Sequence, residues 1–265
     1  MSLTAGSGPL GEKPAGRFNF TPDPPTGSAL LWDPVPYRLR AYLAGECVLD
    51  TTDAKLLHET GHLPVYYVPE ADLRADLLEP SERTSRCPHK GEASYRSLRV
   101  GDRVAQDAVW AYREPLEPAA FLAGHAALYW DRVDEWYVEE EQVFGHPRDP
   151  YHRIDVYRTT RPVRATLAGE VLAESVRAKV LYETSHPPRF YLPAEDVRID
   201  LLEPSGARTR CAYKGEASYW HARAGGELHE DVAWTYPDPD DDGRDVRDLV
   251  CFDETRVELE VSEQG

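Results

Sequence analysis

CPHKGEASYR at residues 87–96 returns as CAYKGEASYW at residues 211–220. Both copies keep the cysteine, the tyrosine and the run Lys-Gly-Glu-Ala-Ser between them. Outward from this segment, residues 40–95 align with residues 164–219 without a gap, and more than half of the aligned residues are identical. The period is longer than that of solenoid repeats. The sequence therefore predicts that one domain-sized unit occurs twice.

The alignment continues from DAVWAY at residues 107–112 onto DVAWTY at residues 231–236. Beyond a loop that we expect to differ by two residues, LYWDRVDEWYVE at residues 128–139 pairs with VCFDETRVELEV at residues 250–261. The predicted organisation is a flexible lead over residues 1–31, a first domain over 32–139, a bridge over 140–162 and a second domain over 163–265.

Most segments of each copy favour β-strands. VRATLAGEVLAE at residues 163–174 alternates apolar and polar residues around Ala-Gly-Glu, which is typical of a hairpin. The aromatic segments 64–69 and 189–193 end in proline, as short strands often do. Residues 51–60 and 174–184 fit either a strand or a helical turn. We expect seven or eight strands per copy and few short helices.

Five short motifs occur in both copies: A-G-E hairpins (44–46, 168–170), E-T-x-H-x-P segments (59–64, 183–188), DLLEPS (76–81, 200–205), C-x-x-KGEASY and W-x-Y strands (110–112, 234–236). In this combination the sequence resembles the DUF427 family in its tandem two-domain form. The resemblance implies an all-β fold of two β-tent, or Mss4-like, domains made of twisted antiparallel sheets, and we expect a pseudo-twofold axis to relate them.

The sequence departs from the family pattern at Ala212, where proline is usual, and at Arg96, where tryptophan is usual. Proteins of the implied fold include methionine sulfoxide reductases, zinc-binding chaperones of small GTPases and aromatic-cage domains, and many hold zinc with two C-x-x-C pairs. Neither pair is present, so we predict no metal and no cofactor. The family name carries a nucleotidyltransferase label. This sequence shows neither the Gly-rich phosphate loop nor the paired magnesium-binding aspartates that such an activity would use.

Charge and hydropathy narrow the classes of partner. The 265 residues carry a formal net charge of −17, which disfavours nucleic acid and anionic membrane surfaces as partners. Every apolar run is shorter than the ~20 residues that span a bilayer. The first residues lack the features of a secretory signal, so we expect a soluble cytoplasmic protein. The spacing of the four cysteines does not favour a disulfide framework.

Several charged residues repeated in both copies are candidates for chemistry. Gly91 and Gly215 predict a turn with positive φ, which places a lysine and a glutamate at the start of a strand. These residues fit either a pocket mouth or an ion pair that closes the turn. A glutamate beside an aromatic strand fits either an acid/base group with a raised pKa or a strand-end hydrogen bond. The candidate catalytic residues are Glu59, Lys90, Glu92, Glu183, Lys214 and Glu216.

Aromatic residues also recur at equivalent positions and fit equally a protein core or the wall of a pocket. In the first copy His89 lies two residues from Cys87, so an activated thiol and a buried inert cysteine are both compatible with the sequence. The candidate ligand-binding residues are Tyr67, Cys87, His89, Tyr95, Trp110, Tyr112, Tyr191, Tyr219, Trp234 and Tyr236.

The bridge is rich in charged residues rather than in glycine and serine. We expect its side chains to form salt bridges that fix the angle between the domains, although they also suit a ligand site at the junction. The residues concerned are His146, Arg148, Asp149, His152, Arg153 and Asp155.

Three functional classes fit the sequence. The first is a module that binds a small molecule in aromatic-lined pockets, one per copy or one at the junction. The second is an enzyme with acid/base or hydrolytic chemistry that uses the glutamates, lysines and tyrosines named above. The third is a structural or protein-interaction module without a ligand. We favour binding, because no nucleophile–base–orienter set is recognisable.

Overall fold

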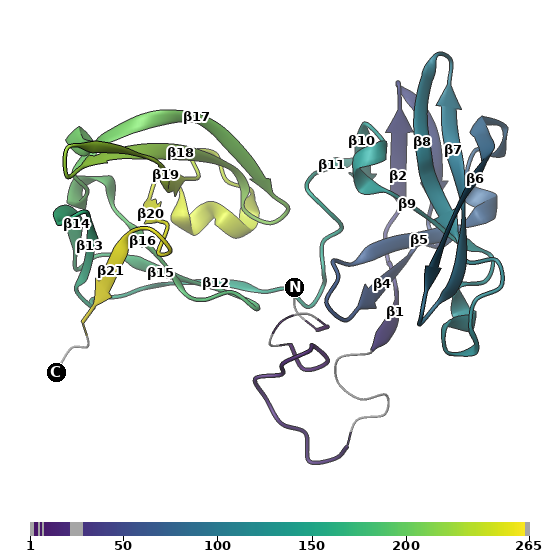
Figure 1. Ribbon diagram of the computed structural model, residues 1–265, viewed down its shortest axis with the longest axis horizontal. Helices are drawn as coiled ribbons and strands as arrows, with labels where there is room; N and C mark the ends of the chain where they lie inside the picture. Colours follow the sequence, from purple (N-terminus) through teal and green to yellow (C-terminus); the bar gives the residue numbers. More distant parts are fainter. Residues whose placement is uncertain (1–2, 5, 7, 22–28, 263–265) are drawn as a thin grey trace. The chain divides into compact units, whose positions relative to one another are not determined.

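The computed structural model describes the chain apart from residues 1–2, 5, 7, 22–28 and 263–265 (Figure 1). The chain divides into two compact units, Met1–Tyr151 (unit 1) and His152–Gly265 (unit 2). The expected flexible lead over residues 1–31 lies partly outside the described residues. Within its described part, the Leu10 carbonyl accepts a hydrogen bond of 3.0 Å from the Thr60 hydroxyl.

Unit 1 contains two antiparallel sheets (Figure 1). The seven-stranded sheet has the order β1 (Leu30–Pro34), β4 (Lys55–Glu59), β5 (Val65–Pro69), β9 (His125–Leu128), β8 (Arg103–Ala111), β7 (Gly91–Val100) and β6 (Leu78–Cys87). The four-stranded sheet has the order β11 (Glu141–Val143), β10 (Glu135–Val138), β2 (Leu39–Leu43) and β3 (Glu46–Thr51).

Unit 2 repeats this topology (Figure 1). Its large sheet has the order β12 (Ile154–Arg158), β15 (Lys179–Glu183), β16 (Arg189–Leu192), β20 (Val250–Phe252), β19 (Glu227–Thr235), β18 (Gly215–Ala224) and β17 (Leu202–Cys211). The small sheet has the order β14 (Glu170–Ser175), β13 (Val163–Leu167) and β21 (Glu258–Val261). The matching strand order confirms the duplicated, all-β prediction. Strand β12 lies within the stretch that the sequence assigned to the bridge.

Helical structure is limited to short 3₁₀ turns in the described residues, as expected. These are η1 (Glu70–Asp72), η2 (Ala75–Leu77), η3 (Glu117–Leu122), η4 (Trp130–Arg132), η5 (Ala194–Asp196), η6 (Ile199–Leu201) and η7 (Asp241–Val246). In the part of the chain that is described, none of these helices has the length and apolar character needed to cross a membrane. The two segments that fitted either a strand or a helical turn form β4 and β15, and each unit has more strands than predicted. Strands of three or four residues, such as β11 and β20, are too short to leave an alternating pattern in the sequence.

The small-sheet hairpins have the turn that their sequence predicts. Ala44 and Gly45 have φ of 49° and 80°, and Ala168 and Gly169 have φ of 47° and 80°. Two successive residues with positive φ match the twist of the flanking strands in a type I′ hairpin.

The backbone hydrogen bonds correct the alignment of the last strands. The Tyr129 N–H donates to the Ala108 carbonyl, and the Asp253 N–H donates to the Val232 carbonyl. Ala108 and Val232 are equivalent, so Tyr129 corresponds to Asp253. The predicted pairing of residues 128–139 with residues 250–261 is therefore wrong. The chain keeps the same register through β9 and β20, and the length difference falls later.

Each large sheet buries both of its faces, because successive side chains of a strand point to opposite sides. On β5, Tyr66 packs into the core between the two sheets, whereas Tyr67 packs into a second cluster on the other face. Phe190 and Tyr191 on β16 repeat this division. We call the face that carries Tyr67 or Tyr191 the ring face of its unit.

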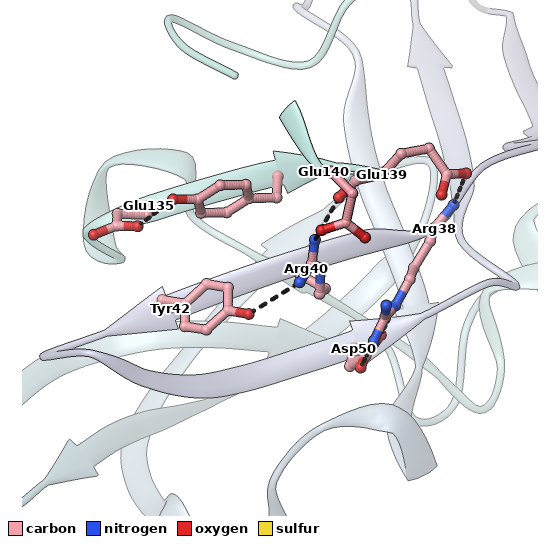
Figure 2. A network of polar contacts seen from close by, with 8 residues as sticks. Arg38, Arg40, Tyr42, Asp50, Glu135, Glu139 and Glu140 are labelled. Carbon is pink, nitrogen blue, oxygen red and sulfur yellow. Dashed lines mark hydrogen bonds and ion pairs between the residues drawn. The ribbon is translucent and has the colours of Figure 1, made fainter. Parts of the chain in front are cut away.

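The outer side of the four-stranded sheet in unit 1 carries a polar network (Figure 2). Arg38, which directly precedes β2, donates two hydrogen bonds, of 2.7 and 2.5 Å, to Asp50 on β3. Arg40 donates to Glu140 at 2.9 Å and to Tyr42 at 3.3 Å. These contacts connect the start of β2 with β3 and with the residues that follow β10. They lie on the face of the four-stranded sheet that points away from the core, and not on the ring face of the seven-stranded sheet.

Strands β6 and β17 form one edge of each large sheet. Both begin with Leu-Glu-Pro-Ser, and the pairing register shifts just after Pro80 and Pro204. Each edge is therefore interrupted by a proline and an irregularity at the same place.

Candidate functional site

A pocket of about 340 Å³ opens on the ring face of unit 2. Six of its lining residues were singled out in the sequence, namely Glu183, Tyr191, Lys214, Tyr219, Trp234 and Tyr236, and the others are His186, Arg189, Asp231 and Asp253. A second hollow, of about 460 Å³, lies beside β13 and β14, and none of the predicted site residues lines it.

The register of the large sheet builds the aromatic wall of the pocket. Tyr191 pairs with Cys251, Cys251 pairs with Trp234, and Trp234 pairs with Tyr219. Directly paired residues share a face, so the three rings lie in one row across the sheet. The Trp234 Nε1–H donates to the Tyr191 hydroxyl at 3.3 Å, and the Tyr219 hydroxyl lies 2.8 Å from that of Thr209. These hydrogen bonds fix the orientation of the wall.

Lys214 reaches the pocket from the turn between β17 and β18. The next residue, Gly215, has a φ of 92°, and a Cβ there would lie 2.9 Å from the backbone nitrogen of Asp240. Gly91 in unit 1 has a φ of 102°, so the positive φ predicted for both glycines is confirmed. The Nζ of Lys214 donates to Glu183 at the end of β15.

The Glu183–Lys214 ion pair is largely buried, with side chains 13% and 8% exposed. His152 also donates to Glu183 at 3.1 Å, and its ring stacks on Tyr213. Burial alone would raise the pKa of Glu183, but the His152 hydrogen bond and the Lys214 charge outweigh it and lower the pKa to about 2. The hypothesis that this glutamate has a raised pKa is therefore wrong.

The buried phenols of the pocket are neutral donors. Burial raises the pKa of Tyr191 and of Tyr236 above the ordinary value of 10.0, and the neighbouring ionisable groups raise it further. Both hydroxyls therefore keep their protons throughout the neutral range.

Unit 1 holds the equivalent residues on its own ring face. Lys90 donates to Glu59, and both side chains are largely buried. The ammonium of Lys90 also lies 5.9 Å from the centre of the Tyr112 ring. The predicted rings of this unit pack together in one cluster: Tyr67, Tyr95, Trp110 and Tyr112.

An additional ring covers the aromatic wall in unit 1. The Tyr129 ring centre lies 4.4 Å from that of Trp110. The equivalent positions in unit 2 are Asp253 and Trp234, and both line the pocket. A carboxylate in place of a phenol ring leaves space beside the tryptophan of unit 2.

A cation also covers the ring face in unit 1. The Arg83 guanidinium lies 4.3 Å from the centre of the Tyr95 ring and 3.6 Å from an oxygen of Asp107. The residue of unit 2 that corresponds to Arg83 is Ala207. The two units therefore share one scaffold and differ in what covers its rings.

Four of the predicted site residues belong neither to the buried ion pairs nor to the rows of rings. Glu92 and Glu216 are exposed on β7 and β18, so the lysines pair with glutamates 31 positions away in the chain rather than with these neighbours. His89 is exposed, and Cys87 is half-buried against the ring cluster of unit 1.

One bridge residue, Asp149, lies beside a buried histidine of unit 1. Asp149 is buried, and its carboxylate lies 3.8 Å from the ring of His58, which also lies 3.7 Å from Asp33. Burial lowers the pKa of His58, against the effect of the two carboxylates. Sequence reasoning did not identify His58, although a histidine in the apolar run of β4 is a signal for it. The role of the bridge in fixing the angle between the domains stays a prediction.

Comparison with known proteins supplies the family. No curated protein matches the sequence. A family profile described as a domain of unknown function (DUF427) matches the chain twice, over residues 32–139 and 155–263. Each match covers the lysine turn and the aromatic strands of one unit. The chain therefore belongs to the DUF427 family and carries two copies of its domain.

Proposed function

We propose that the protein binds a small molecule in the pocket of unit 2. The observation that carries this proposal is the pocket itself, which combines a volume of about 340 Å³ with an aromatic wall and a few charged groups. Ligand sites are typically hollows of ~300–1,000 Å³ with apolar walls and a small number of polar groups that set orientation.

The wall is prepared before any ligand arrives. Hydrogen bonds hold the Trp234, Tyr191 and Tyr219 rings in place, and the sheet fixes their backbone. A ligand that enters a preformed site loses less free energy to the ordering of side chains. This arrangement supports binding by unit 2.

The charge states of the buried groups favour binding over acid/base catalysis. A general acid or base works best when its pKa is near the operating pH. The pKa of Glu183 is about 2, and the pKa values of Tyr191 and Tyr236 are raised above 10.0. At neutral pH the glutamate therefore stays ionised and the two tyrosines stay protonated. Protonation states that do not change suit the recognition of a ligand better than proton transfer.

A thermal-shift screen of small metabolites against the full chain tests the proposal. A ligand at 100 times its Kd stabilises the native state by about 2.7 kcal/mol, which raises the melting temperature of the unit that binds it. Trp234→Ala should abolish the shift given by a true ligand. Trp110→Ala makes the same truncation in unit 1 and should leave the shift intact.

A second variant separates loss of the pocket from loss of the fold. Asp253→Tyr places a ring beside Trp234 as Tyr129 stands beside Trp110, so it should close the pocket while the sheet stays folded. Circular dichroism checks the fold. Ligands whose shift persists in both unit 2 variants contradict the proposal, and a screen without hits favours a structural or protein-interaction role.

A further inference from the structure

In unit 1 an arginine side chain lies over an aromatic ring on the ring face. The Arg83 guanidinium lies over the face of Tyr95, with 4.3 Å between its central carbon and the ring centre. It also lies 3.6 Å from Asp107, whose other carboxylate oxygen accepts a hydrogen bond of 2.5 Å from Ser81. The π-surface of an aromatic ring and a carboxylate together attract a flat cation by cation–π and ion-pair interactions.

Unit 2 keeps the corresponding ring and carboxylate but has no arginine at the position of Arg83. Tyr219 and Asp231 correspond to Tyr95 and Asp107, and Ala207 stands in place of the arginine. The two aspartates have nearly the same left-handed backbone, with φ of 52° and 50°. Each tyrosine hydroxyl lies 2.8 Å from a hydroxyl on the neighbouring strand. The backbone of the aspartate and the hydrogen bond of the tyrosine are therefore alike in the two units, whereas the carboxylate that accepts from Ser81 in unit 1 lies beside His221 in unit 2. Tyr219 and Asp231 both line the pocket.

The second difference between the units adds negative charge at this place. Asp253 replaces Tyr129, so two carboxylates flank the aromatic wall. Among the residues that the structure describes, neither Asp231 nor Asp253 forms an ion pair with a lysine or an arginine. One carboxylate oxygen of Asp231 is buried without a hydrogen-bond partner. The His221 Nδ1 accepts the Asp231 backbone N–H at 3.0 Å and lies 3.5 Å from the carboxylate.

The cations of the pocket are already paired with other residues. Lys214 donates to Glu183. Arg189 lies 3.4 Å from Glu254, and its guanidinium lies 5.8 Å from the centre of the Trp234 ring, so the cation proposed below is assigned to Tyr219 and Asp231. Among the described pocket residues, the carboxylates without a lysine or arginine partner are those of Asp231 and Asp253, and they lie beside the aromatic wall.

We propose that the pocket of unit 2 receives the guanidinium or ammonium group of a small organic cation, in the place that the Arg83 side chain occupies in unit 1. This inference rests on the small-molecule function proposed above and adds the ligand class. The flat head of a guanidinium is the best fit, because unit 1 holds that group against the same ring and the same carboxylate.

The test uses two probes of nearly equal shape and different charge. n-Butylguanidinium carries the cation, and n-butylurea is its neutral counterpart. Titration of the full chain, followed by amide chemical shifts, should give at least tenfold tighter binding of n-butylguanidinium, with shifts concentrated on β18 and β19. n-Butylammonium, as a third probe, should also bind more tightly than the urea. Equal affinity for the charged and neutral probes would overturn the proposal.

Two variants locate the site. Ala207→Arg gives unit 2 the internal cation of unit 1 and should weaken n-butylguanidinium binding at least tenfold. Asp231→Asn removes one carboxylate and should weaken it by a similar factor, whereas Asp107→Asn in unit 1 should leave it unchanged. Affinity that persists in both unit 2 variants refutes the assignment.

The results also distinguish this inference from the function on which it rests. If neutral or anionic ligands bind in a manner that depends on Trp234 while n-butylguanidinium does not bind, the pocket is a ligand site of another class and the cation proposal is wrong. If no probe or metabolite binds, both proposals are rejected.

Discussion

Replacing Glu183 with glutamine tests the buried ion pair at the pocket through its pH dependence. The pKa of Glu183 falls from 4.5 to about 2 in the folded protein, because His152 and Lys214 stabilise the carboxylate more than burial destabilises it. At about 1.4 kcal/mol per pKa unit, this shift corresponds to ~3 kcal/mol of stability.

The sign of the pH dependence follows from the lowered pKa. The stabilisation is fully present above pH 4.5, where the carboxylate is ionised in the folded and unfolded chains, and it is lost as the pH falls toward 2. Between pH 7 and pH 3, the difference in unfolding free energy between wild type and Glu183→Gln should therefore shrink by about 2 kcal/mol. The difference between the two proteins removes the contribution of other titrating groups.

Urea unfolding measured in unit 2 gives this quantity. Amide cross-peak intensities from β18 and β19 report this unit alone, which matters because a chain of two units need not unfold in one step. Glu216→Gln is the matched control, since it removes an exposed carboxylate from the same unit and should change stability by less than ~0.5 kcal/mol. A wild-type advantage over Glu183→Gln that is the same at pH 7 and pH 3 refutes the argument.

The remaining predictions concern stability and can be measured by urea unfolding. Gly215→Ala should lower the free energy of unfolding by ~1–3 kcal/mol, because of the positive φ and the close backbone contact. Gly206→Ala, where a Cβ meets nothing within 4 Å, should lower it by less than ~1 kcal/mol. Equal losses would contradict the turn geometry. Leu172→Ala, in the core between the sheets of unit 2, should cost ~2–5 kcal/mol, and a loss below ~1 kcal/mol would contradict its burial. A double-mutant cycle on Arg38 and Asp50, the pair drawn in Figure 2, should show little coupling between the two side chains, because both are exposed and solvent screens their charges; a coupling as large as the loss from either single substitution would show that the network is a main support of the sheet.

The sequence predicted the scaffold of the site but not the partners within it. The repeated glycines correctly predicted the turns that carry the lysines, because backbone conformation depends mainly on the local sequence. One of the two interpretations of the lysine turn was an ion pair between Lys214 and Glu216, an acidic residue in the strand that follows. The pleat turns Glu216 to solvent, and the fold brings Glu183 to the lysine from another strand. Long-range pairing of this kind is not visible in a single sequence.

The difference between the two copies was hidden for a related reason. The two-residue difference expected before the last strands put Tyr129 opposite Cys251, and the hydrogen bonds put it opposite Asp253. The exchange of a phenol for a carboxylate, which opens the pocket, appears only when the strand register is known. The Arg83-to-Ala207 difference was present in the alignment, but its meaning depends on the ring that lies beneath the arginine.

The interrupted edges of the large sheets bear on how a chain with two similar domains folds at all. While it folds, the open edge of one domain offers a template to strands of the other, and hybrid sheets are a characteristic failure of tandem repeats. Pro80 and Pro204 each remove a backbone donor from the edge, and the irregularity after each proline spoils the register for a foreign strand. We therefore expect each hairpin to close most readily with its own partner, and the interrupted edges to disfavour strand exchange between the copies.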